Sequence, residues 1–259
     1  MWNEPSAGVA VSALDPESRS RQPEPAVVAS VESGSIGEEL GFEPGDQLLS
    51  INGVRPRDLI DYRYLIVEEE LTLEVRDSAG AMHCVELEKD ADDGLGLAFT
   101  EALFDGLRQC TNRCPFCFID QQPPGHRDSL YLKDDDYRLS FLYGSYLTLT
   151  NLNDADWERI EQQRLTPLFV SVHATDPDLR STLLENPRAG KLLKQLEWFA
   201  QRNLQIHAQV VVCPGLNDGD ALLNTLRDLA RFAGVEWPAV LSACLLYTSP
   251  SPRDHPRSR

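Results

Sequence analysis

The sequence predicts an α/β protein in two parts: a small β-rich domain followed by a partial (β/α) barrel. Up to about residue 93, short β-branched runs are separated by turns rich in glycine and proline. Beyond that point, apolar runs of strand length alternate with segments whose leucines recur at helical spacing. Strands that alternate with helices form parallel sheets from right-handed βαβ units, so the second part predicts a barrel-like sheet.

Length and composition limit the classes of protein that need to be considered. At 259 residues and 42% hydrophobic, the chain can form one large or two smaller domains. It has no apolar run of about 18 residues, so we expect no membrane span. Its N-terminus lacks a basic flank followed by an apolar stretch, so we expect no signal peptide and a cytoplasmic location. Because thiols stay reduced there, the six cysteines are expected to be ligands or buried thiols.

The net charge of −17 is concentrated in the first part of the chain. Residues 1–100 hold 7 Lys and Arg against 21 Asp and Glu, whereas residues 101–259 hold 17 against 20. Phosphate-bearing partners attract basic surfaces, so this acidity argues against nucleic acid and anionic lipid as partners. The argument is weaker for the second part, which is nearly neutral.

Residues 1–25 are polar and contain four prolines, and we expect a flexible lead-in there. The first domain is expected over residues 26–93. Its expected elements are, in order, strand 26–31, helix 36–40, strand 48–51, a hairpin turn at Asn52-Gly53, helix 59–67, and strands 70–76 and 82–88.

Three glycine-containing motifs mark the first domain: Ser33-Gly-Ser-Ile-Gly37, Gly41 with Pro44-Gly45-Asp46, and Ile51-Asn52-Gly53. Through these motifs, residues 26–90 resemble a PDZ-like domain of the bacterial, protease-associated type. PDZ domains bind peptides by adding them to the sheet as a strand, so the resemblance implies a peptide or protein partner. Because no clear carboxylate-binding glycine loop precedes the first strand, a docking or packing role remains the alternative.

The second domain is expected over residues 94–243, after the acidic joint 89–94. Its expected elements are, in order, a strand within 97–107 that leads into a cysteine loop, a strand within 138–151 that ends at Thr150, helix 154–164, strand 168–172, helices 176–184 and 191–202, strand 206–212, helix 218–232 and a strand that starts near 239. Residues 244–259 read like translated adapter sequence. We expect a non-native tail there, with the natural chain continuing differently after about Ala243 and the barrel therefore incomplete.

Three cysteines dominate the functional interpretation: Cys110, Cys114 and Cys117, in the run Cys-Thr-Asn-Arg-Cys-Pro-Phe-Cys. With this spacing, three thiolates can hold one corner of a cubane iron–sulfur cluster and leave the fourth iron without a protein ligand. Ordinary clusters have four cysteine ligands. An open iron can bind and reduce a substrate, so the spacing predicts chemistry at the cluster.

Two other metal sites are weighed against the cluster. His126 could complete a Cys3His zinc site, but structural zinc sites usually pair their ligands in two short knuckles. The carboxylates of Asp134, Asp135 and Asp136 could hold a metal or act in acid–base chemistry, although a solvated charge run is the more ordinary interpretation. The sequence therefore favours the cluster.

The cysteine loop, with Phe116 before its third cysteine, resembles the cluster motif of radical SAM enzymes. Residues 134–146, 170–177 and 212–219 extend the resemblance to a family of PDZ-containing radical SAM proteins that are named iron–sulfur oxidoreductases and whose reaction is not established. The resemblance implies a [4Fe–4S] cluster, S-adenosylmethionine, reductive cleavage of that molecule to start a radical reaction on an unknown substrate, and an electron donor such as flavodoxin or ferredoxin. The alternative is an iron–sulfur scaffold or sensor that recruits a partner without turnover.

Polar groups at the ends of the expected strands are the candidates for contacting S-adenosylmethionine, because ligands of such folds lie at the carboxyl ends of the strands. These polar candidates are Thr150, Asn151, Ser171, His173 and Gln209, and the resemblance of the cysteine loop adds Phe116 as a cofactor-binding residue. For each of the five polar residues the alternative is a satisfied polar group at a strand end or helix cap. Tyr143-Gly144-Ser145 is the nearest match to the glycine-rich stretch that contacts the methionine amine in many radical SAM enzymes.

Overall fold

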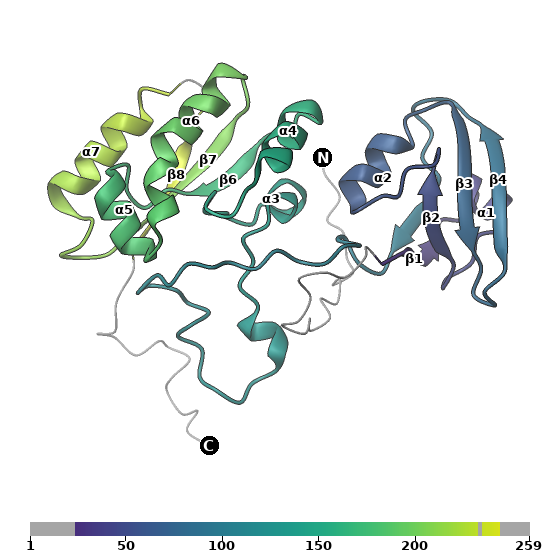
Figure 1. Cartoon of the computed structure of the whole chain (residues 1–259), viewed down its shortest axis with the longest axis horizontal. Helices are drawn as coiled ribbons and strands as arrows, with labels where there is room; N and C mark the ends of the chain where they lie inside the picture. The colour runs from purple at the N-terminus through teal and green to yellow at the C-terminus, as the bar shows by residue number, and fades with distance from the viewer. Residues whose placement is uncertain (1–23, 233–234, 244–259) are drawn as a thin grey trace. The chain divides into compact units, whose positions relative to one another are not determined.

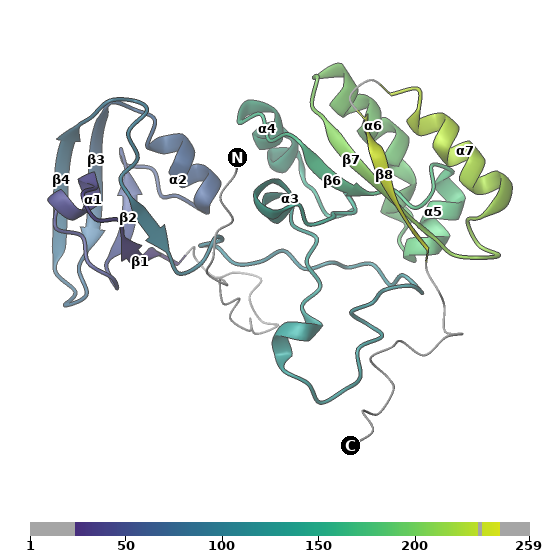
Figure 2. The same ribbon diagram turned by 180° about the vertical axis from the view of Figure 1, so that it is seen from behind.

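The computed structural model describes residues 24–232 and 235–243, and the expected tail 244–259 and nearly all of the expected lead-in 1–25 lie outside them. The chain forms two compact units that divide between Leu107 and Arg108 (Figure 1; Figure 2 gives the view from behind). Among the described residues, no helix has both the length and the apolar character needed to cross a bilayer.

The first unit is a five-stranded antiparallel sheet in the order β4-β3-β2-β1-β5. Its elements are β1 (Ala26–Val31), α1 (Ile36–Glu39), β2 (Gln47–Ile51), α2 (Leu59–Leu65), β3 (Glu70–Arg76), β4 (Met82–Glu88) and β5 (Leu97–Phe99). Asn52 and Gly53, at φ of 50° and 75°, form the expected two-residue turn between Ile51 and Val54. The β-rich first part is thus confirmed.

The segment after the acidic joint differs from the prediction. The sequence predicts a strand that leads from residue 97 into the cysteine loop, whereas β5 is three residues long and pairs with β1 of the first unit. Leu95 and Phe104 lie in the core of that unit, and Leu103 forms a bridge with Asp58. The compact units therefore divide after Leu107, beyond the boundary placed at the acidic joint.

The second unit is built around a three-stranded parallel sheet in the order β6-β7-β8. Its elements are the 3-10 turn η1 (Asp128–Tyr131), α3 (Tyr137–Tyr143), α4 (Asp154–Gln162), β6 (Leu168–Ser171), α5 (Pro177–Leu184), the 3-10 turn η2 (Pro187–Lys191), α6 (Leu192–Gln201), β7 (Ile206–Val212), α7 (Gly219–Leu229) and β8 (Val235–Ala243). The mixed α/β class is confirmed. The described strands form an open sheet, so the partial barrel stays a prediction.

Residues 138–151 are predicted to contain one strand that ends at Thr150, whereas the structure has helix α3 in the first half of this range and a single β-bridge at Leu147 in the second. The side chain of Asp136 accepts a hydrogen bond from the backbone N–H of Arg138 and starts α3, which ends at Gly144 with φ 76°. Beyond the helix, the chain runs parallel to β6 through one bridge between Leu147 and Val170. This bridge brings the candidate residues near Thr150 to the carboxyl end of β6.

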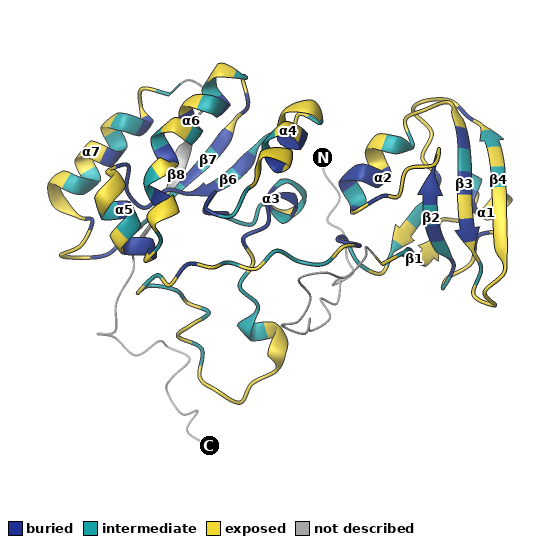
Figure 3. Cartoon of the chain, viewed as in Figure 1, coloured by how far each residue is buried: buried dark blue, intermediate teal, exposed yellow. Residues whose placement is uncertain are grey.

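Only one face of the parallel sheet of the second unit is covered by the helices α5, α6 and α7. Figures 1 and 2 agree that α5, α6 and α7 lie on one face of the sheet. Along β7, Ile206, Ala208 and Val210 are buried, whereas His207 and Gln209 are half-buried (Figure 3). Since successive strand residues point to opposite faces, His207 and Gln209 lie on the face without these helices.

The packing of β5 against α1 can be tested at Gly37. A Cβ atom at Gly37 would lie 2.6 Å from the carbonyl oxygen of Leu95 and 2.7 Å from Cδ2 of Leu97. We expect Gly37→Ala to destabilise the first unit by about 1–3 kcal/mol, as forced overpacking does. Hydrogen–deuterium exchange of β1 and β2 in the full chain measures the effect.

Gly94→Ala is the matched control, because its Cβ would meet only the backbone nitrogen of Gly96, at 4.0 Å. Exchange in this control should equal that of the parent chain. Equal exchange in Gly37→Ala and Gly94→Ala would mean that residues 95–97 do not pack on α1.

Candidate functional site at the cysteine loop

The cysteine loop is attached to the second unit through its backbone. The N–H of Cys110 donates to the carbonyl oxygen of Lys133 (2.7 Å), and the N–H of Arg113 donates to that of Leu184 at the end of α5 (3.0 Å). Cys114 packs against the apolar cluster that contains Leu184. The loop therefore lies at the carboxyl-terminal end of α5.

The three thiols are half-buried and free of disulfides. Burial raises the pKa of Cys114 to about 12, with the neighbouring thiols of Cys110 and Cys117 adding to the shift. Burial and the carboxylate of Asp135 raise the pKa of Cys110. Without a metal, the thiols of Cys110 and Cys114 are therefore held protonated at neutral pH.

Asn112, between the first two cysteines, is buried and uses its whole amide. Its Nδ2 donates to Sγ of Cys110 (3.3 Å) and to Oγ1 of Thr148 (2.9 Å). Its Oδ1 accepts from Oγ1 of Thr150 (3.2 Å) and from Nδ2 of Asn186 (2.7 Å). Asn112 thus connects a cysteine sulfur with two strand-end hydroxyls, and the sequence analysis did not single it out.

The interpretation of Asp134, Asp135 and Asp136 as a solvated run is wrong for two of the three. Asp135 and Asp136 are each 1% exposed. Asp135 accepts hydrogen bonds from the backbone N–H (2.5 Å) and the hydroxyl (2.6 Å) of Thr148. Asp136 pairs with Arg138 at 2.7 Å. Burial raises the pKa of Asp135, whereas the Arg138 guanidinium holds the pKa of Asp136 low despite its burial.

Arg180 is fully buried on α5. Its Nε donates to the carbonyl oxygen of Val172 (2.8 Å) and its Nη1 to that of Ala189 (2.7 Å). Its Nη2 donates to the carbonyl oxygens of Thr148 (2.9 Å) and Ser171 (2.8 Å). Burial lowers the pKa of Arg180 to about 10, so the guanidinium remains charged at neutral pH.

Arg180 is another residue that the sequence analysis missed, although the sequence carries a signal for it. Leu183 and Leu184 follow it three and four residues later, so all three share one face of a helix. A cation on the apolar face of a helix is an indication of a buried, fully bonded charge.

His173 lies at the carboxyl end of β6 in the left-handed conformation (φ 61°). Its ring contacts Phe116 edge-on at 4.7 Å, so the structure brings these two predicted residues together. Its Nδ1 accepts the backbone N–H of Val211 (3.2 Å), and only an unprotonated ring nitrogen can accept. The ring is therefore neutral with its proton on Nε2. Burial and, secondarily, the charge of Arg180 lower its pKa to about 3.

The remaining predicted residues lie around the same strand ends. Ser171 and Gln209 are register partners on β6 and β7, and neither side chain has a hydrogen-bond partner among the described residues. Asn151 donates from Nδ2 to the carbonyl oxygen of Asp135 (2.8 Å), while its buried Oδ1 has no partner there. Gly144, by contrast, ends α3 against the ring of Phe169 at the beginning of β6. The glycine of Tyr143-Gly144-Ser145 is thus not at the strand ends.

The donor atoms of the cysteine loop meet part of what an iron–sulfur cluster requires. The three half-buried, disulfide-free thiols are the right ligand type, and Asn112 already donates to one of them. Within residues 24–232 and 235–243, however, no three His, Cys, Asp or Glu side chains are grouped closely enough to hold a metal ion. His126 is exposed and donates its backbone N–H to the hydroxyl of Tyr131, so its ring is not assembled with the cysteines into a zinc site.

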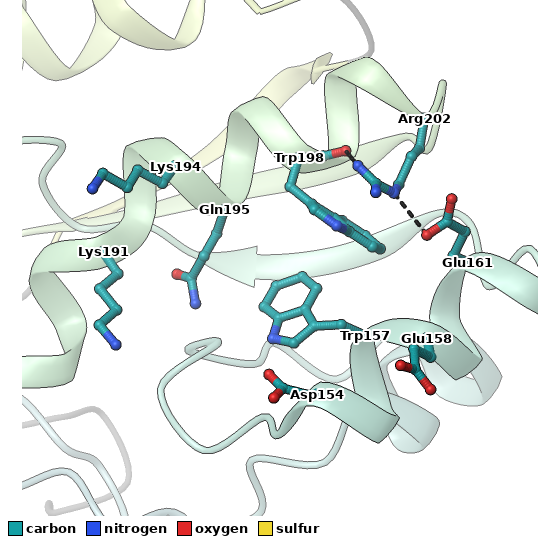
Figure 4. Close-up of a pocket in the computed structure, with 9 residues that line it drawn as sticks. All are labelled: Asp154, Trp157, Glu158, Glu161, Lys191, Lys194, Gln195, Trp198 and Arg202. Carbon is teal, nitrogen blue, oxygen red and sulfur yellow. Dashed lines mark hydrogen bonds and ion pairs between the residues drawn. The ribbon is translucent and has the colours of Figure 1, made fainter.

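A separate hollow of about 470 Å³ lies between α4 and α6 (Figure 4). The rings of Trp157 and Trp198 meet edge to face in it with centroids 4.8 Å apart, and Arg202 pairs with Glu161 at 2.8 Å. Acidic side chains of α4 line one side of it, and basic side chains in α6 and directly before and after that helix line the other (Lys191, Lys194 and Arg202). None of the predicted site residues lines this hollow.

The fold and the loop define the class of protein: an α/β unit with a three-cysteine loop beside the carboxyl ends of parallel strands. Residues 89–242 match the family model described as a radical SAM-like domain. This match covers more than half of the chain, and the chain therefore belongs to the radical SAM-like family. Residues 27–77 match the model of the PDZ domain.

Among solved structures, the PDZ domain of the SdrC-like protein of Listeria innocua is similar at 16% identity. The alignment covers 31% of this chain and 99% of that one, with a TM-score of 0.26. No curated protein matches the chain.

The protonation of His173 gives a test of the site in the metal-free protein. Its folded pKa of about 3 lies below the ordinary 6.5, so between these values the unfolded chain binds a proton that the folded chain does not. The stabilising contribution of the neutral ring is complete above pH 6.5. It falls by up to about 1.4 kcal/mol per pH unit as the pH drops towards 3.

Nitrogen-15 NMR of the ring should show one neutral form, with the proton on Nε2, between pH 8 and pH 5. In His173→Asn, which tolerates the left-handed backbone, this part of the pH dependence of unfolding should disappear. A His173 ring that titrates near its ordinary pKa in the folded protein would contradict the assignment.

Proposed function

We propose that the second unit binds a [4Fe–4S] cluster through Cys110, Cys114 and Cys117 and cleaves S-adenosylmethionine reductively. The observation that carries the proposal is the set of hydrogen bonds of Asn112. Its side chain bonds to the sulfur of Cys110 and to the hydroxyls of Thr148 and Thr150 at the strand ends. It ties the cysteine loop to the place where the candidate cofactor residues gather. Membership of the radical SAM-like family supports the same reaction class.

The chain's own residues would hold and orient the cofactor. Ser171 and Gln209 offer a hydroxyl and an amide with no partner among the described residues. The buried Oδ1 of Asn151 lacks a donor, as the amine of S-adenosylmethionine would supply. Nε2–H of His173 is a pH-independent donor beside Phe116, because Nδ1 is already an acceptor.

Cofactors held in this way would supply a low-potential electron and, from the cleaved sulfonium, a radical able to take hydrogen from a substrate. The protein's part is position and exclusion of water. We propose completion of the open three-stranded sheet as a partial barrel, an oxidoreductase role, and an electron donor of the flavodoxin or ferredoxin type. A scaffold or sensor without turnover is the competing function.

Anaerobic reconstitution tests the proposal. The full chain should take up iron with broad visible absorption and, with dithionite and S-adenosylmethionine, release 5′-deoxyadenosine. Replacing any of Cys110, Cys114 or Cys117 by Ala should abolish both iron uptake and the product. Cys84→Ala, which removes an exposed thiol of β4, and His126→Ala are the controls and should change neither.

Each result decides between the functions. Zinc without iron, lost in His126→Ala, would establish the Cys3His site and refute the cluster. Iron uptake without 5′-deoxyadenosine would favour the scaffold or sensor.

We further propose that the first unit binds a peptide at β5. This strand is at the edge of its sheet, and α2 lies beside it through the contact of Tyr62 with Phe99 at 4.8 Å. The backbone N–H groups of Gly94, Leu95 and Gly96, just before β5, have no acceptor among the described residues. Consecutive free N–H groups suit a peptide carboxylate, and an open strand edge suits an added strand.

A library of fluorescent hexapeptides with apolar C-terminal residues provides the probes. Binding, read as fluorescence anisotropy with the full chain, should weaken about tenfold or more when the best peptide carries a C-terminal amide, because the charge-assisted hydrogen bonds are lost. Equal binding of acid and amide would refute carboxylate capture. Binding of no peptide would leave β5 with a packing role.

A further inference from the structure

Arg180 contacts three separate segments of the strand-end region with one planar group. It binds the carbonyl oxygens of Ser171 and Val172 at the end of β6, of Thr148 in the neighbouring segment, and of Ala189 in η2. All four distances fall between 2.7 and 2.9 Å, and the side chain is 0% exposed. Only a guanidinium has enough fixed donors for four acceptors in different directions.

Asp135 supplies the counter-charge of Arg180, and both side chains bond to the same residue, Thr148. The backbone N–H of Thr148 donates to Asp135, and the carbonyl oxygen of the same residue accepts from Arg180. A buried carboxylate and a buried guanidinium therefore hold Thr148 from its two sides. Removing either charge would leave the other unpaired inside the protein, which is strongly unfavourable.

Thr148 extends this constraint to the cysteine loop. Its hydroxyl accepts from Nδ2 of Asn112, which also donates to the sulfur of Cys110. The loop is also bonded directly to the helix that carries Arg180, from Arg113 N–H to the carbonyl oxygen of Leu184. An unbroken series of contacts thus leads from Arg180 to a cysteine.

We propose that Arg180 is the positioning residue of the cofactor site, fixing the strand ends that carry Ser171 and His173 and, through Thr148 and Asn112, the sulfur of Cys110. This inference rests on the proposed function for the identity of the cofactors, but the positioning itself is a property of the metal-free chain. Arg180 acts through other residues, since backbone carbonyls engage four of its five N–H donors.

Arg180→Lys is the informative substitution, because it keeps the charge but cannot reach four carbonyls. Arg180→Gln removes the charge as well. The matched control is Arg159→Lys in α4, a buried arginine that donates to the side chain of Gln163 (2.8 Å) and to the hydroxyl of Tyr137 (3.1 Å). All three variants are expected to fold with lowered thermal stability.

Hydrogen–deuterium exchange of the metal-free full chain is the first measurement. We expect Arg180→Lys and Arg180→Gln to speed exchange about tenfold or more in residues 110–117, 147–151 and 171–174, with little change in β7. Arg159→Lys should leave those three segments unchanged. This readout does not depend on iron.

The second measurement is the electron paramagnetic resonance signal of the reduced, reconstituted protein. In the parent chain it should change on adding S-adenosylmethionine. In Arg180→Lys, half of that change should need about tenfold more S-adenosylmethionine, whereas Arg159→Lys should match the parent. A merely structural role would lower the stability of both variants without separating them in this titration.

Each outcome supports or refutes the positioning role of Arg180. Parental exchange and titration in Arg180→Lys would overturn the inference while leaving the proposed function intact. A parent chain that takes up no iron would refute the proposed function, and exchange alone would then decide the role of Arg180. If both Arg180 variants fail to fold while Arg159→Lys folds, Arg180 supports the whole fold and the positioning role is refuted.

Discussion

A single buried cation determines the arrangement of the strand ends in the second unit. The guanidinium of Arg180 donates to four backbone carbonyl oxygens: those of Ser171 and Val172 at the end of β6, of Thr148, and of Ala189 in η2. A buried backbone carbonyl without a hydrogen-bond partner lowers the stability of the fold. A buried guanidinium without a counter-charge such as Asp135 lowers it as well. Because Thr148 lies between the two charges, the position of every group bonded to Thr148 follows from this pair.

The one-sided cover of the parallel sheet explains where the polar groups gather. The face towards α5, α6 and α7 takes the apolar half of β7, including Ala208 and Val210. The other half, with Gln209, is left for polar side chains, and parallel register sets Ser171 beside Gln209. Ser171 and Gln209 could be named from the sequence because they are polar residues within or at the end of expected strands. Their pairing depends on the register between two strands, which alternation within one strand does not determine.

The errors of prediction have identifiable physical causes. Residues 70–76 and 206–212 are predicted to the residue because burial alternates along them, whereas the apolar run after Arg138 fits a buried strand or a helix equally well. Its helix is decided by the Asp136 cap and the left-handed Gly144. The pairing of β5 with β1 is a contact between residues far apart in the chain, and no local pattern encodes it. The burial of Asp135 likewise depends on distant Thr148.

Residues that hold the fold together differ from residues that could bind a ligand in how many of their donors and acceptors the protein itself uses. Asn112 and Arg180 spend their donors on the protein itself, so they hold the geometry and have little left for a ligand. Among the described residues, unused capacity near the loop remains on the side chains of Ser171 and Gln209, on Oδ1 of Asn151 and on Nε2 of His173. These groups form no hydrogen bond within the described part of the chain, and a polar group that is buried without a partner lowers the stability of the fold. The ligand proposed above would supply these groups with partners, because a zwitterionic, hydroxyl-bearing molecule such as S-adenosylmethionine offers the hydrogen bonds that an apolar one lacks.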